Sequence, residues 1–155
     1  MQSDTTNRVT RREWRELGFF YDCDENSKVW RLTGSRDGLR RFRDVLHLYA
    51  ADPRNAVVPE HQHYGPYMHL VIQTSLNAGF DDQSIHGSVI DLARLANLVE
   101  VKLLDAHPGS VLRIEDEFAA GSSYALILDV REDGFDPAKA DPLLPPEDDA
   151  ALGTS

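Results

Sequence analysis

Histidines gather in one short segment of this 155-residue chain, between Glu60 and His69. His61, His63 and His69 lie there, and His86 follows in the next predicted loop. An H-x-H pair on an extended segment directs both imidazoles to the same side, and His69 or His86 could complete a metal site. The alternative is a polar loop in which the imidazoles bond to the backbone and to neighbouring carboxylates. A metal site made by His61, His63, His69 and His86 therefore stays an open interpretation.

A recognition surface is the second interpretation of the same segment. Tyr64 and Tyr67 flank a Gly-Pro turn, and tyrosine is enriched in interfaces because it offers large contact area at low entropic cost. Glu115 and Glu117 share one face of a strand predicted over residues 111–118, which gives that face negative charge. The residues predicted to bind a partner are His61, His63, Tyr64, Tyr67, His69, His86, Glu115 and Glu117.

Nucleophilic catalysis has little support in this sequence. The one cysteine, Cys23, lies between Asp22 and Asp24, and these carboxylates should raise the pKa of its thiol and suppress the thiolate. No G-x-S-x-G elbow and no glycine-rich phosphate loop is present. We therefore predict no catalytic residue and no cofactor, and we favour a binding protein over an enzyme.

The formal net charge of -10 restricts the partners. Such a surface repels phosphate groups, so we expect no nucleic-acid partner and no adhesion to anionic membranes. The polar stretch Met1–Arg12 lacks the apolar core of a signal peptide, and no apolar run reaches the roughly 20 residues that a spanning helix needs. We therefore expect a cytoplasmic protein.

Hydrophobic periodicity predicts seven elements in the order ββαβαββ. Ser35 and Ser88 are predicted to cap the two helices, because a serine side chain accepts a bond from the first free N–H groups. The simplest arrangement is an α+β two-layer sandwich, with two helices on one face of a mostly antiparallel five-stranded sheet. The predicted elements are strands 19–23 and 28–33, helix 36–50, strand 67–74, helix 88–106, and strands 111–118 and 124–131.

Composition divides the chain into three parts. Residues 1–12 are expected to be flexible, residues 13–144 form one α+β domain, and residues 145–155 form an acidic, proline-containing mobile tail. The length suits one domain, since single domains most often have about 100–150 residues.

Five segments of this sequence together resemble a known group of proteins. They are Glu13–Phe19, Trp30–Ser35, Tyr49–Asn55, Glu60–Tyr67 and Ile85–Gly87. They are similar to small bacterial immunity-like proteins of polymorphic toxin systems, over about residues 14–144. The resemblance implies a protein that neutralises a cognate toxin by binding it, and it brings no catalytic residues.

Two hypotheses follow for the function. The first is a cytoplasmic immunity-type inhibitor whose acidic surface is steered toward a protein partner such as a basic toxin domain. The alternative is a metal-dependent enzyme or metal-binding protein that uses the four histidines. The oligomeric state is left open by the sequence.

Overall fold

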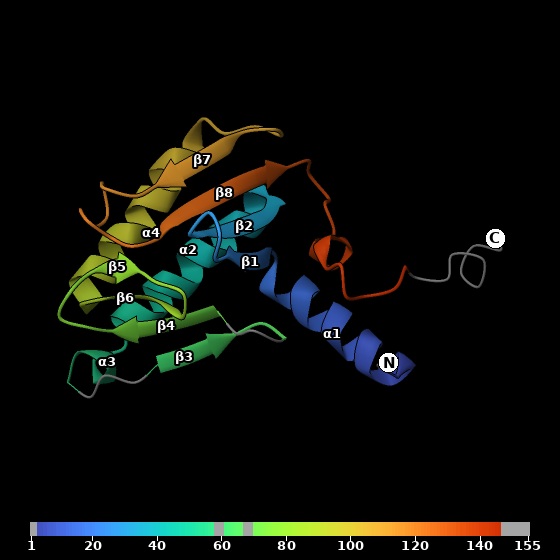
Figure 1. The fold of residues 1–155 in the computed structure, drawn as a ribbon, viewed down its shortest axis with the longest axis horizontal. Helices are drawn as coiled ribbons and strands as arrows, with labels where there is room; N and C mark the ends of the chain where they lie inside the picture. Colours follow the sequence, from blue (N-terminus) through green and yellow to red (C-terminus); the bar gives the residue numbers. More distant parts are fainter. Residues whose placement is uncertain (1–2, 58–60, 67–69, 147–155) are drawn as a thin grey trace.

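The protein has an α+β fold with two mixed four-stranded sheets (Figure 1). The computed structural model describes residues 3–57, 61–66 and 70–146. The first half contains α1 (Asp4–Leu17), β1 (Phe20–Asp24), β2 (Val29–Ser35), α2 (Arg36–Ala51), α3 (Arg54–Val57), β3 (His61–Tyr64) and β4 (Leu70–Thr74). The second half contains β5 (Gly79–Phe80), β6 (Ser84–Gly87), α4 (Val89–Leu104), β7 (Val111–Ile114), β8 (Ala125–Arg131) and the short 3₁₀ helix η1 (Pro137–Ala140).

Each sheet contains one parallel pair of strands. The first has the order β1-β2-β8-β7, in which β2 and β8 run parallel, and the second has the order β3-β4-β6-β5, in which β4 and β6 run parallel. This arrangement differs from the single five-stranded, mostly antiparallel sheet that the sequence predicted. The strands β3, β5 and β6 are short and carry polar residues or glycine, so they lack the alternating apolar pattern by which strands are recognised.

The helices α2 and α4 form the hydrophobic centre of the molecule. Ser35 and Ser88 accept backbone N–H groups at their N-termini, which confirms both predicted caps. The two helices pack against each other behind the strands, and Arg43 of α2 pairs with Glu100 of α4 across the contact (Figure 1). The main buried cluster includes residues of both helices and both sheets, among them Phe42, Leu46, Leu92, Leu95, Ile72 and Leu128.

The N-terminal segment is helical, in contrast to the flexible stretch expected over residues 1–12. Ser3 caps α1 by accepting the backbone N–H of Thr6. Trp14 is 1% exposed, and its Nε1 donates to Oδ2 of Asp141 at 2.9 Å. The guanidinium of Arg15 forms a two-pronged contact with the carboxylate of Asp136. The helix was missed because its packing depends mainly on one tryptophan and on a partner 127 residues away, not on a regular apolar stripe.

The C-terminal segment folds back over the domain. Between η1 and Pro146 it lies beside α1, and Asp141 is 4% exposed there. Residues 147–155, most of the predicted tail, lie outside the described part of the chain. Among the helices that the structure describes, none has both the length and the apolar character needed to cross a bilayer.

Replacing Trp14 with Phe should lower the free energy of unfolding by about 1–3 kcal/mol, because the buried carboxylate of Asp141 loses a hydrogen-bond donor. Urea denaturation of both proteins measures the difference. The companion variant Asp141→Asn keeps an acceptor oxygen and should lose less. Unchanged stability of Trp14→Phe would show that the contact does not hold α1 in place.

Candidate functional site

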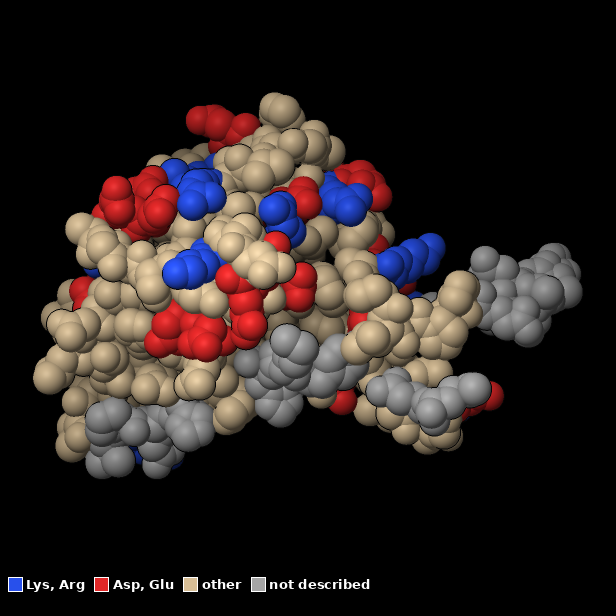
Figure 2. Space-filling model, viewed as in Figure 1, with Lys and Arg blue, Asp and Glu red and all other residues tan. Residues whose placement is uncertain are grey.

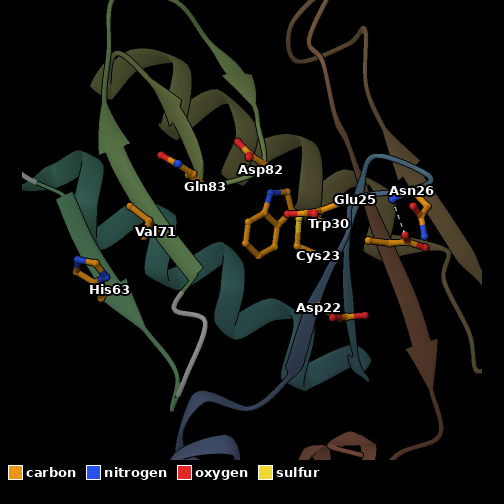
Figure 3. A pocket seen from close by; sticks show the side chains of 10 residues that line it. Asp22, Cys23, Glu25, Asn26, Trp30, His63, Val71, Asp82 and Gln83 are labelled. Carbon is orange, nitrogen blue, oxygen red and sulfur yellow. Dashed lines mark hydrogen bonds between the residues drawn. The ribbon is translucent and has the colours of Figure 1, made fainter.

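A groove lies between the two sheets, and its lining includes four carboxylates (Figure 3). Its volume is about 790 Å³, and Trp30, His63 and Val71 contribute to its lining. Figure 2 shows acidic side chains gathered on the face of the molecule where the sheets approach each other. The four carboxylates that line it, which define the acidic groove, belong to Asp22, Asp24, Glu25 and Asp82.

The β1–β2 hairpin positions three of these carboxylates. Its register pairs Tyr21 with Leu32 and Asp24 with Val29, so Asp22 and Asp24 point the same way, away from the buried side of β1. Oδ1 of Asp24 accepts the backbone N–H groups of Asn26 and Ser27 at 2.9 and 3.3 Å, which closes the turn. Hydrogen bonds from Ser27 and then from Asn26 hold the pKa of Asp24 below its ordinary value, so this carboxylate remains charged at neutral pH.

The fourth carboxylate comes from the turn between β5 and β6. Asp81 organises this turn, because its Oδ1 accepts the backbone N–H groups of Gln83 and Ser84, both at 2.8 Å. The side chain of Asp82 is left exposed at the edge of the groove. Nε1 of Trp30 donates to the backbone oxygen of Asp81 at 2.6 Å, so the turn is tied directly to β2.

A buried tyrosine makes the second connection between the sheets. Oη of Tyr21 donates to the backbone oxygen of Tyr64 at 2.8 Å, at the end of β3. Burial raises the pKa of Tyr21 well above its ordinary value, so the hydroxyl stays protonated as a donor. Gly65 has φ 92°, and a Cβ there would lie 2.2 Å from the same Oη, so only glycine fits over this ring.

Cys23 lines the groove but is poorly suited to be a nucleophile. Burial raises the pKa of its thiol to about 11, and the charges of Glu25, Asp22, Asp82 and Asp24 add to the shift. The predicted direction is confirmed, although burial contributes more than the neighbouring charges. At neutral pH the sulfur therefore carries its proton.

Of the four histidines that the sequence grouped together, the structure describes the side chains of His63 and His86, and these lie in different hollows. His63 lines the acidic groove and is exposed. His86 lies in a different hollow, where Nδ1 contacts the backbone oxygen of Asn77 at 2.8 Å and Nε2 lies 3.4 Å from Oδ2 of Asp81. Tyr67, His69 and the side chain of His61 lie outside the described residues.

Tyr64 has a structural role in this arrangement. Its side chain is half-buried and packs against the main core, while its backbone oxygen accepts the bond from Tyr21. Tyr64 was predicted as part of a recognition surface, and the structure places it, half-buried, at the junction of the two sheets.

The glutamates predicted on one strand face are not on a strand. The strand β7 ends at Ile114, and the following residues form a turn. Oε2 of Glu117 lies 2.7 Å from Nζ of Lys102, and Oε2 of Glu115 accepts Nε of Arg113 at 3.0 Å. Neither Glu115 nor Glu117 lines the acidic groove.

The described residues do not assemble a metal site. Within residues 3–57, 61–66 and 70–146, no three His, Cys, Asp or Glu side chains converge on a common point. In addition, both ring nitrogens of His86 already face other partners. Of the proposed metal ligands, the structure therefore describes only His63 and His86, which lie in different hollows.

Sequence reasoning missed most of the acidic groove. Asp22 and Asp24 were considered as neighbours of Cys23, and Glu25 and Asp82 were not among the residues predicted to bind a partner. Two short acidic runs, residues 22–25 and 81–82, were the available signal. These two acidic runs lie more than fifty residues apart in the chain. They come together only because of how the two sheets pack.

Comparisons with known proteins add no relative. Neither the family models nor the curated proteins nor the solved structures gave a match to this chain. The resemblance to immunity-like proteins therefore rests on the sequence segments that were quoted for it.

Replacing Tyr21 with Phe should cost about 1 kcal/mol of stability, because the backbone oxygen of Tyr64 loses its donor. Amide hydrogen exchange over residues 61–66 should also accelerate relative to that over α4. Tyr124→Phe is the control, since its hydroxyl makes no hydrogen bond among the described residues. Equal exchange in all three proteins would contradict the role of Tyr21 as a connection between the sheets.

Alkylation of Cys23 by iodoacetamide should be slow at neutral pH and should rise until about pH 11, because only the thiolate reacts. An unperturbed cysteine levels off near a pKa of about 8.5. Glu25→Gln should shift the profile of Cys23 to lower pH by removing a nearby negative charge. A profile that levels off near pH 8.5 in the wild-type protein would rule out this environment.

Proposed function

We propose that the protein is an immunity-type inhibitor that binds a basic toxin domain through the acidic groove. The observation that carries the proposal is the set of carboxylates without ion-pair partners around that groove. Asp22, Asp24, Glu25 and Asp82 form no salt bridge among the described residues. Their negative charge is offset only in part, by Arg31, which lies opposite Asp22 in the hairpin and forms its salt bridge with Asp129.

Several carboxylates elsewhere on the surface are paired with a basic side chain. Asp52 pairs with Arg54 at 2.7 Å, Asp136 with Arg15 at 2.8 Å, and Glu117 with Lys102 at 2.7 Å. A pair of this kind cancels much of its own field, whereas unpaired charges in a groove focus the potential. The acidic groove therefore supports attraction of Lys and Arg side chains better than the faces that the sequence suggested.

The environment of Cys23 also supports binding over catalysis. A groove that keeps its thiol protonated offers no activated nucleophile. Complementary charge at an interface accelerates association and selects the partner, which suits an inhibitor that must reach its toxin quickly. We place this function in the cytoplasm, where a toxin of this kind would act on the producing cell.

Neutralising the groove should abolish protection. Asp22→Asn/Glu25→Gln/Asp82→Asn removes three carboxylates from the groove, and its matched control, Asp116→Asn/Glu132→Gln/Asp133→Asn, removes three exposed carboxylates elsewhere. Each protein is co-expressed with the product of the neighbouring gene, which we expect to be toxic, and growth is measured. We expect rescue by wild type and control, no rescue by the groove variant, and affinity at least about tenfold weaker for that variant.

Calorimetry at two salt concentrations provides the second measurement. Wild-type binding should weaken at higher salt, because screening reduces the attraction between exposed charges. Rescue by the groove variant equal to that by the control would contradict the proposal, and so would a wild-type protein that binds no product of the neighbouring gene.

A further inference from the structure

A small apolar pocket adjoins the acidic groove. It has a volume of about 230 Å³, and it shares Asp22, Cys23 and Trp30 with the groove. Binding sites for drug-sized ligands occupy roughly 300–1,000 Å³, so this space suits a single side chain better. The residues that enclose its apolar part, which define the apolar pocket, are Trp14, Phe20, Tyr21, Trp30, Pro142 and Leu143.

Aromatic rings give the pocket a firm wall. The ring centroids of Trp14 and Phe20 are 4.8 Å apart, those of Trp14 and Tyr21 are 4.9 Å apart, and those of Tyr21 and Trp30 are 6.4 Å apart. Trp14, Tyr21 and Trp30 each donate a hydrogen bond to a fixed partner, so their rings are held in place. A prearranged pocket costs a ligand less ordering entropy on binding.

At the opposite rim of the pocket, the large apolar side chain of Leu143 is exposed to solvent. Leu143 is 66% exposed, and its backbone N–H donates to Oδ1 of Asp141 at 2.9 Å. The other oxygen of Asp141 accepts Nε1 of Trp14, so one buried carboxylate fixes both the wall and the rim. An exposed leucine held beside aromatic rings would lose water-exposed apolar surface if a ligand bound there, which favours binding.

We propose that the apolar pocket binds one hydrophobic side chain of the same partner segment whose Lys or Arg side chains occupy the acidic groove. This inference rests on the proposed function and specifies the partner's chemistry. Charge complementarity decides the occupant, because Asp22 stands on the boundary between groove and pocket and is exposed. A buried anchor surrounded by charges that confer selectivity is a common division of labour at protein interfaces.

Two synthetic peptides test this inference on the full-length protein. One contains lysines and serines around a central phenylalanine, and the other has serine in place of the phenylalanine. The two tryptophans of the chain both line the pocket, so their fluorescence reports a phenylalanine that enters it. We expect the phenylalanine peptide to bind about tenfold more tightly, which corresponds to 1.4 kcal/mol, and to change the emission.

Leu143→Ser is the test variant, and Leu48→Ser, 74% exposed on α2, is the matched control. The test variant should lose most of the preference for phenylalanine, while the control should keep it. Both substitutions affect exposed side chains, so both proteins should fold.

Three outcomes separate this inference from the proposed function. Preference for phenylalanine that Leu143→Ser abolishes supports the pocket. Equal binding of both peptides, still dependent on Asp22, Glu25 and Asp82, overturns the pocket and leaves the acidic groove standing. If neither peptide binds the wild-type protein at low salt, both proposals are overturned.

Discussion

The arrangement of the whole molecule depends on two buried aromatic donors that must find acceptors in the other sheet. Tyr21 and Trp30 are each less than 5% exposed, and each donates to a backbone oxygen of the second sheet or its turns. An unsatisfied buried donor costs about 1–3 kcal/mol, so any sliding of one sheet against the other is penalised twice. Apolar packing alone would tolerate small displacements, whereas hydrogen bonds restrict both distance and direction. The acidic groove is the space that remains between sheets held in this way.

A second constraint closes the chain on itself. Asp141 accepts from Trp14 and from the backbone of Leu143, so the N-terminal helix and the C-terminal segment hold each other. The pair Arg15–Asp136 reinforces the contact close to the surface. Both segments border the strand β1, which also contributes Asp22, Cys23 and Asp24 to the acidic groove. The apolar pocket and the acidic groove therefore depend on the same strand.

The distribution of charge suggests a role for β1 in binding a basic partner. Many of the described carboxylates pair with an arginine or a lysine, whereas the four that line the acidic groove form no such salt bridge among the described residues. The same carboxylates help to keep the thiol of Cys23 protonated. The surface that would attract a basic partner therefore carries no activated nucleophile at Cys23. That combination fits recognition better than turnover.

The sequence by itself determined the α+β class, the helices α2 and α4 with their serine caps, the β1–β2 hairpin and the direction of the Cys23 pKa shift. These features depend on neighbours within a few residues, so periodicity and local charge reveal them. Only the tertiary structure decided that α1 is a docked helix, that β2 pairs with β8 and β4 with β6, and that Asp82 joins Asp22, Asp24 and Glu25. It also separated His63 from His86. Contacts between residues far apart in the chain follow from how the sheets pack, and no local pattern records that packing.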